Sequence, residues 1–282
     1  ANTTDLTKTP VVSTDDVKRI DQAFTPKLGL VYQPTKDMSL FASYSNSFTP
    51  NTGTTVDLKV IKPSLIDQYE LGIKKDFWRG ILSTNVTLYQ IENSNLAQTA
   101  EFKADGSANT DSSIKTLSGS TKSKGVEIDI TARPTTGLSI IAGYSYNDMR
   151  YTKTSGLEGS FIIGDRLART PTNTANLSFF YTLQSGLLKG FSIGSSANYI
   201  GKRVGGWNNQ YKAAEPNGIF DRGIPLEDYA TVDVSAGYEW GKFSILCKLS
   251  NSTNELNYTV HENYSVNPIA PRQVMTALKY KF

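Results

Sequence analysis

The sequence holds a single cysteine, Cys247, and a single histidine, His261, and this scarcity excludes two kinds of site. One thiol cannot build a disulfide framework, and one imidazole cannot build a multi-histidine metal site. No apolar run approaches the roughly 18 residues that a membrane-spanning helix needs. The net charge of +3 is spread along 282 residues, so the chain also lacks the basic patch of a nucleic-acid-binding protein.

Aromatic residues, in contrast, are plentiful, with 15 Tyr, 12 Phe and 3 Trp, and many occur in segments that alternate between apolar and polar residues. The end of the chain is the clearest case, because one face carries Val274, Thr276, Leu278, Tyr280 and Phe282. A period of two predicts a β-strand with one apolar face. Such segments run to about ten residues, the length of a tilted strand that crosses a bilayer, whereas strands of soluble proteins are nearer five or six.

The alternation predicts eleven antiparallel strands, at 24–33, 38–48, 64–77, 81–92, 120–134, 138–151, 172–184, 190–203, 228–240, 242–252 and 272–282. Short turns connect some of them, and the long polar connections are 49–63, 93–119, 152–171, 204–227 and 253–271. Short turns at one end and long loops at the other are typical of an outer-membrane barrel. The pattern leaves open one alternative, a secreted all-β protein with long surface loops.

The odd number of strands matters for closure, because an up-and-down barrel closes with antiparallel neighbours only when the number is even. Val11–Ile20 offers no lipid-compatible face for a twelfth strand, since it carries Asp15, Asp16, Lys18 and Arg19. We therefore expect 24–282 to belong to a larger barrel and 1–23 to be the remnant of an extracellular loop. The first residues also lack the basic segment and apolar core of a secretory signal, which indicates a processed start or a start within a longer chain.

Several motifs occur in a fixed order along the chain. Ser64–Trp78 contains Tyr-Glu-Leu-Gly-Ile-Lys, and the other motifs are Thr25–Tyr32, Phe41–Pro50, Ser123–Ile128, Gly143–Tyr146 and Ala270–Arg272. Together they resemble the TonB-dependent outer-membrane receptors, especially ferric-siderophore receptors of the ferrichrome type. Two departures stand out: Pro63-Ser64 replaces the usual Pro-Glu, and Asn251–Tyr258 keeps the family's Asn and Tyr but lacks the usual Leu-Phe after the Asn.

The resemblance implies an all-β transmembrane antiparallel barrel of 22 strands, of which this chain is the carboxy-terminal half without the plug domain. It implies a receptor in the outer membrane of a Gram-negative bacterium that binds a ferric siderophore and imports it to the periplasm. The TonB complex would act through the missing plug, and the iron would arrive inside its chelate, so no cofactor or protein metal ligand is expected. Import of cobalamin or an oligosaccharide is the alternative within the family, and a secreted glycan-binding β protein is the alternative outside it.

Candidate ligand-binding residues are chosen in or near the expected outer loops, because aromatic residues and Arg concentrate binding energy at recognition surfaces. They are Arg203, Trp207, Tyr211, Tyr258 and Tyr264. The alternative is that these aromatic side chains form an interfacial girdle or pack the loops together.

Other residues are assigned to lipid, assembly and the lumen. We expect the bilayer to contact Val126, Ile128, Tyr144, Leu177, Phe179, Val234 and Leu278. The end of the chain resembles the signal read by the barrel assembly machinery, through Leu278, Tyr280 and Phe282. Glu127 and Asp129 are expected to face a wet lumen or the plug rather than to form an acid–base pair. A single His in a loop supports no Ser–His–Asp arrangement, so the sequence predicts no enzyme.

Overall fold

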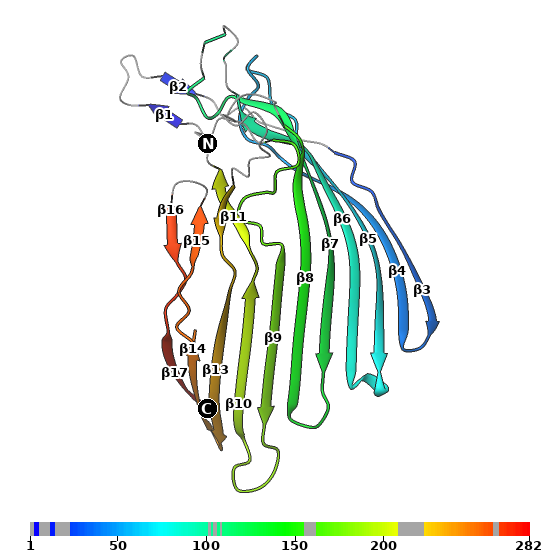
Figure 1. Cartoon of the computed structure of the whole chain (residues 1–282), viewed down its shortest axis with the longest axis vertical. Helices are drawn as coiled ribbons and strands as arrows, with labels where there is room; N and C mark the ends of the chain where they lie inside the picture. The colour runs from blue at the N-terminus through cyan, green and yellow to red at the C-terminus, as the bar shows by residue number, and fades with distance from the viewer. Residues whose placement is uncertain are drawn as a thin grey trace, which may run out of the picture.

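The computed structural model describes residues 3–5, 12–14, 23–100, 103, 106–107, 109–154, 162–207, 223–261 and 265–282. One sheet of eleven strands dominates this part of the chain, with the order β17-β14-β13-β10-β9-β8-β7-β6-β5-β4-β3 and antiparallel pairing throughout (Figure 1). Its strands are β3 (Lys27–Thr35), β4 (Met38–Thr49), β5 (Ser64–Phe77), β6 (Leu82–Thr99), β7 (Lys115–Ala132), β8 (Leu138–Lys153), β9 (Asn173–Thr182), β10 (Phe191–Ile200), β13 (Tyr229–Trp240), β14 (Phe243–Ser250) and β17 (Gln273–Tyr280). Each corresponds to one predicted strand, so the number and order of the predicted strands are confirmed.

Two strands extend well beyond their predicted outer ends. β6 and β7 continue past the expected ends at 92 and 120, and their extensions pair from Leu96 and Gly119 to Thr99 and Lys115. These outer ends are rich in Asn, Ser and Thr and show no apolar alternation. Their ladder is held by backbone hydrogen bonds, which leave no mark in a hydrophobic pattern.

Three two-stranded sheets occupy segments that the sequence predicts to be loops. They pair β1 (Thr3–Asp5) with β2 (Val12–Thr14), β11 (Arg203–Trp207) with β12 (Gly223–Leu226), and β15 (Tyr258–His261) with β16 (Ser265–Pro268). The expected loops 204–227 and 253–271 therefore contain ordered hairpins, and this corrects the prediction. Each strand is too short for a period of two to be visible in the sequence. A 3₁₀ turn, η1 (Trp78–Gly80), connects β5 to β6.

The register of the large sheet gathers the apolar residues on one face. Leu88 lies between Leu71 on one neighbouring strand and Val126 on the other, and Val126 in turn opposes Tyr146. The pairing of each strand with its neighbour continues this face across the sheet. All seven predicted lipid-facing residues lie on it. The opposite face carries Ser, Thr, Asn, Gly and charged residues, as the prediction of a wet lumen requires.

Aromatic rings line the apolar face at the end with the short turns. Their contacts run from Tyr238 through Trp240, Phe243 and Tyr280 to Phe282, with successive ring centres 5.5, 5.9, 4.9 and 5.1 Å apart. The carboxyl terminus lies at this end of the sheet (Figure 1). Such a row of rings is typical of the girdle at a membrane–water interface.

The apolar face also ends in tyrosines toward the long loops. The rings of Tyr44 and Tyr69 lie 5.0 Å apart on adjacent strands. Farther out on the same face charges replace them, and Lys122 Nζ lies 2.6 Å from Glu92 Oε1. An apolar band between two aromatic rows, with ion pairs beyond it, marks the part of the sheet that lies in lipid.

The sheet has no conventional core beneath it. Within the described ranges, Ile61 and Ala100 are the hydrophobic residues that are buried, and both lie near the long-loop end. β3 and β17 are the two edges of the sheet and are not paired with each other. In the same ranges no helix is long and apolar enough to cross a membrane.

Candidate functional site

Two of the predicted ligand-binding residues meet at the end of the sheet that carries the long loops. Arg203 begins β11 and Tyr258 begins β15, and Arg203 Nη2 donates to the carbonyl oxygen of Tyr258 over 2.6 Å. The two hairpins are in contact, and Figure 1 shows β11 beside β15. Trp207 is the last residue of β11. Tyr211 and Tyr264 lie outside the described residues, so a role for all five in ligand binding stays a prediction.

The guanidinium of Arg203 is buried among acceptors from two loops. Nη1 donates to the carbonyl oxygen of Glu227 over 3.0 Å, and Nη2 donates to Asn257 Oδ1 over 3.2 Å. The group also lies 5.2 Å from the centre of the Tyr229 ring, and the residue is 9% exposed. A guanidinium stacked on a ring and bonded at both terminal nitrogens has little freedom to turn. Arg203 therefore joins the residues before β13 to the start of β15.

Tyr258 is exposed to solvent, whereas Arg203 is buried. Its carbonyl oxygen receives the bond from Arg203, while the residue as a whole is 41% exposed. Its backbone is fixed by pairing with Pro268 in the β15–β16 hairpin. Among the predicted ligand residues whose side chains are described, Tyr258 is the one that presents an accessible ring on an ordered element.

A buried asparagine that the sequence reasoning did not assign to the site closes the base of the final loop. Asn251 is 5% exposed, and its Nδ2 donates to the carbonyl oxygens of Glu255 and Ala270 over 2.9 and 3.0 Å. Its own N–H donates to Asp233 Oδ1 over 2.9 Å. These bonds tie the start and end of the loop to β13. The family motif at Asn251–Tyr258 was the available signal.

The segment before β9 is fastened to the outer end of β8 by an unpredicted ion-pair cluster. Arg150 Nε lies 2.9 Å from Asp148 Oδ1, and Arg166 Nη2 lies 3.3 Å from the same oxygen. Arg166 Nη1 also donates to Thr172 Oγ1, and Arg150 Nη1 donates to the carbonyl oxygen of Gly164. Only the fold brings Asp148 and Arg166 together.

The departure at Pro63-Ser64 has a clear local role. Ser64 is 5% exposed, and its hydroxyl lies 3.0 Å from the carbonyl oxygen of Asn95 and 3.2 Å from Asn51 Oδ1. Asn51 Nδ2 donates to the same Asn95 carbonyl over 3.0 Å. A small hydroxyl thus fastens the 50–63 segment, which carries the buried Ile61, to β6.

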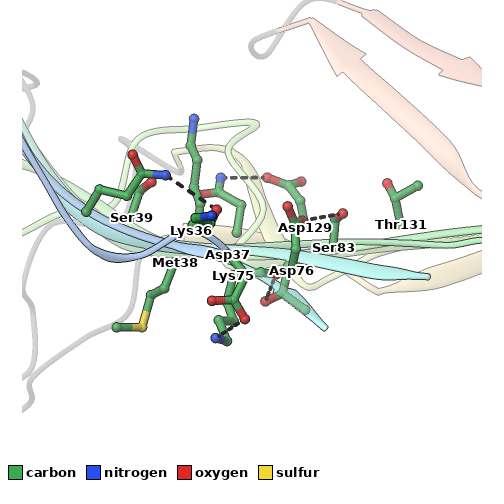
Figure 2. Close-up of a pocket in the computed structure, with 13 residues that line it drawn as sticks. Lys36, Asp37, Met38, Ser39, Lys75, Asp76, Ser83, Asp129 and Thr131 are labelled. Atoms are coloured by element: carbon green, nitrogen blue, oxygen red, sulfur yellow. Dashed lines mark hydrogen bonds and ion pairs between the residues drawn. The ribbon is translucent and has the colours of Figure 1, made fainter. Parts of the chain in front are cut away.

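A pocket of about 450 Å³ lies at the opposite end, near the short turns (Figure 2). Asn85 Nδ2 donates to Asp129 Oδ2 over 3.2 Å, and Ser83 Oγ donates to Asp76 Oδ1 over 2.6 Å. Figure 2 shows Asp129 and Thr131 on one side of the sheet and Met38 on the other. These carboxylates are occupied by neutral donors on an open polar face, an arrangement that suits packing more than acid–base chemistry.

One of the carboxyl groups that line this pocket, that of Asp37, is strongly perturbed. Lys75 Nζ lies 2.5 Å from Asp37 Oδ2, and Thr35 Oγ1 donates to Asp37 Oδ1 over 2.6 Å. First the bond from Lys75 and then that from Thr35 lower the pKa of Asp37 from 3.8 to about 2. Because the folded-state pKa is depressed, this contribution to stability is present above the unfolded value and is lost as the pH falls through about 2.

The described residues also show what chemistry the two ends of the sheet offer. Among the residues that the structure describes, no group of three His, Cys, Asp or Glu side chains is placed to hold a metal ion. The outer end carries an exposed tyrosine, Tyr258, on a hairpin that the internal hydrogen bonds of Arg203 help to hold in place.

An antiparallel sheet with one continuous apolar face, aromatic rows at both ends of that face and short turns at one end is the wall of an outer-membrane β-barrel. Residues 2–252 match the family described as TonB dependent receptor-like, beta-barrel. The chain belongs to this family of outer-membrane receptors and transporters, and its apolar face is therefore the lipid face. The predicted family, barrel class and location are confirmed.

Two relatives that are much longer than this chain are similar over most of it. The metal-pseudopaline receptor CntO of Pseudomonas aeruginosa is 28% identical over 267 residues, which cover 94% of this chain and 34% of the receptor. The ferrichrome outer membrane transporter/phage receptor of Escherichia coli is 30% identical over 205 residues, which cover 72% of this chain and 25% of the transporter. The chain thus spans about a third or less of these relatives.

A solved structure shares the fold. The ferripyoverdine receptor of Pseudomonas aeruginosa, bound to ferripyoverdine, matches with a TM-score of 0.76 at 24% identity. The match covers 96% of this chain and 35% of that receptor. It extends beyond the large sheet to nearly the entire sequence.

Proposed function

We propose that this chain is the carboxy-terminal barrel wall of a TonB-dependent receptor that binds ferric siderophores outside the cell and imports them to the periplasm. Residues 24–282 supply the wall and 1–23 belong to an outer loop, while the plug lies elsewhere in the receptor. Family membership and the share of the longer relatives that the chain covers support this assignment. One relative is named as a metal-pseudopaline receptor and another as a ferrichrome transporter. These names favour a metal chelate as the cargo.

The observation that carries the proposal is the ordered outer surface around Tyr258. An exposed ring there lies beside hairpins that are held by Arg203 and Asn251. A ferric siderophore is compact and partly apolar with polar edges, so an accessible aromatic ring on a fixed hairpin suits it. The iron travels inside its chelate, so the receptor needs no resident metal and no catalytic group.

Three partners follow from this role. The TonB complex would act through the plug, and outer-membrane lipid would cover the apolar face. The barrel assembly machinery would recognise the end of β17, where Phe282 is fully exposed and its ring packs edge-on against Tyr280.

Binding of a ferric hydroxamate to the complete receptor tests the function. We expect Tyr258→Ala or Trp207→Ala to weaken binding about thirtyfold, because truncating one anchor typically costs about 2 kcal/mol or more. Tyr69→Ala is the matched control, since Tyr69 packs on Tyr44 in the lipid-level row and should leave the affinity unchanged. The dissociation constant of each of the three variants is measured by titration with tryptophan fluorescence and is compared at equal surface level. Wild-type affinity in both loop variants would place the ligand elsewhere, and absence of binding by the wild-type receptor would overturn the siderophore assignment.

A further inference from the structure

Arg203 connects parts of the chain that are far apart in sequence. Its acceptors are the carbonyl oxygen of Glu227, just before β13, and Asn257 and the carbonyl oxygen of Tyr258, at the start of β15. Asn257 reinforces the same junction, because its Oδ1 also accepts the N–H of Tyr258 over 2.8 Å. One side chain therefore holds the β11–β12 hairpin against the β15–β16 hairpin.

The charge of this side chain is unusual for a buried group. Within the described ranges, Arg203 is the one charged residue that is buried, and each acceptor recorded for its guanidinium is neutral. The carboxylate of Glu227 faces away, because its Oε2 lies 2.9 Å from Lys202 Nζ in an ion pair whose side chains are 71% and 70% exposed. A buried charge is costly unless every donor has a partner in place, so the acceptors must stay where they are.

β11 is also tied on its other side. The N–H of Arg169 donates to the carbonyl oxygen of Val204 over 2.6 Å, and the segment that carries Arg169 is fastened to β8 by the Arg166–Asp148 pair. The outer ends of the chain from β8 to β15 are thus joined through β11. Arg203 is the buried residue that links β11 to β15 among these contacts.

We propose that Arg203 is a positioning residue that locks the β11–β12 and β15–β16 hairpins into one rigid wall. The wall exists before any ligand arrives, and in the proposed siderophore receptor it presents Tyr258 in a fixed place. Ligand affinity then depends on Arg203 through preorganisation and not through contact with the chelate. Only this last consequence rests on the proposed function, since the lock between the hairpins is a property of the empty receptor.

The distance between the hairpins in the ligand-free receptor tests the lock. Spin labels on cysteines at Ile224 in β12 and Val266 in β16, which are 44% and 61% exposed, report it in a Cys247→Ser background. We expect one narrow distance distribution for wild type and at least a twofold broader one for Arg203→Met and Arg203→Lys. Lysine keeps the charge but has no planar fork to reach acceptors on both hairpins.

Two further variants separate a lock from general damage. Lys202→Met removes the neighbouring exposed cation and should leave the distribution narrow. Asn257→Leu removes an acceptor from the opposite hairpin and should broaden it, so the test does not depend on Arg203 variants that fail to assemble. Equal widths in wild type, Arg203→Lys and Asn257→Leu would overturn the proposal. These distances are read without ligand, so a receptor that binds no ferric siderophore would refute the proposed function and leave the lock intact.

If the receptor does bind a ferric hydroxamate, Arg203→Lys should raise the dissociation rate about tenfold, while Lys202→Met should not change it. A broadened distribution with an unchanged dissociation rate would show that the lock does not serve the ligand.

Discussion

Two glycines of the polar face make room for aromatic rings from the neighbouring strand. A Cβ atom on Gly72 would lie 2.3 Å from the ring of Phe41, and a Cβ on Gly125 would lie 2.4 Å from the hydroxyl of Tyr89. The Gly125 Cβ would also lie 2.2 Å from the carbonyl oxygen of Tyr146, a backbone atom that cannot swing aside. Glycine within a strand often marks such a close approach, and here it lets rings lie flat on the lumen wall.

Gly125→Ala should therefore destabilise the barrel by about 1–3 kcal/mol, the usual cost of overpacking. Gly29→Ala is the matched control, because it also lies on the polar face of a strand and a Cβ there would meet nothing within 4 Å. Urea unfolding of the complete receptor in detergent gives both values. Equal stability of the two variants would contradict this account of Gly125.

The strands differ sharply between their two faces. In β9, Leu177 opposes Ala142 and Ala197 on the lipid face, whereas the next residue, Ser178, opposes Ile141 and Ser196 on the polar face. A shift of register by one residue would exchange these faces, so the apolar band fixes the register of every strand.

Arginine substitutions at adjacent positions of β9 test this assignment. Leu177→Arg should cost about 2–4 kcal/mol, the penalty for a charge on the lipid face near the bilayer midplane. Ser178→Arg should be nearly neutral, because it places the charge in the polar lumen. Refolding of the complete receptor into lipid vesicles across a denaturant series measures the difference. Similar penalties at both positions would refute the barrel orientation.

The large sheet leaves two edges, β3 and β17, whose outer backbone groups have no strand partner in the described residues. Such groups cannot be satisfied by lipid, which is why barrels that span membranes are closed. Both edge strands run in the same direction, since nine antiparallel strands lie between them. They therefore cannot close on each other with antiparallel pairing.

We expect the isolated 282-residue chain to fail to insert as a stable monomeric barrel. Semi-native electrophoresis after refolding in detergent checks this, because a closed barrel migrates faster before heating than after it. The complete receptor, in which further strands cover both edges, is the control and should show the shift. A heat-modifiable monomer of this chain alone would show that its edges find partners within the chain.

The alternation of apolar and polar residues was sufficient to place the eleven long strands and their lipid face, because each strand meets lipid on one side and water on the other along its own length. The environments of Leu177 and Ser178 can be predicted from the sequence alone.

The alternation did not predict the short hairpins β11–β12 and β15–β16 or the outer ends of β6 and β7, since backbone hydrogen bonds among polar residues hold them. Arg203 shows the same limit most clearly. Its position at the end of a predicted strand, beside an outer loop, suggested a ligand contact, whereas its buried place between Glu227 and Tyr258 depends on two distant loops meeting. Contacts between residues far apart in the chain follow from the packing of the folded loops, and a local pattern carries no record of them.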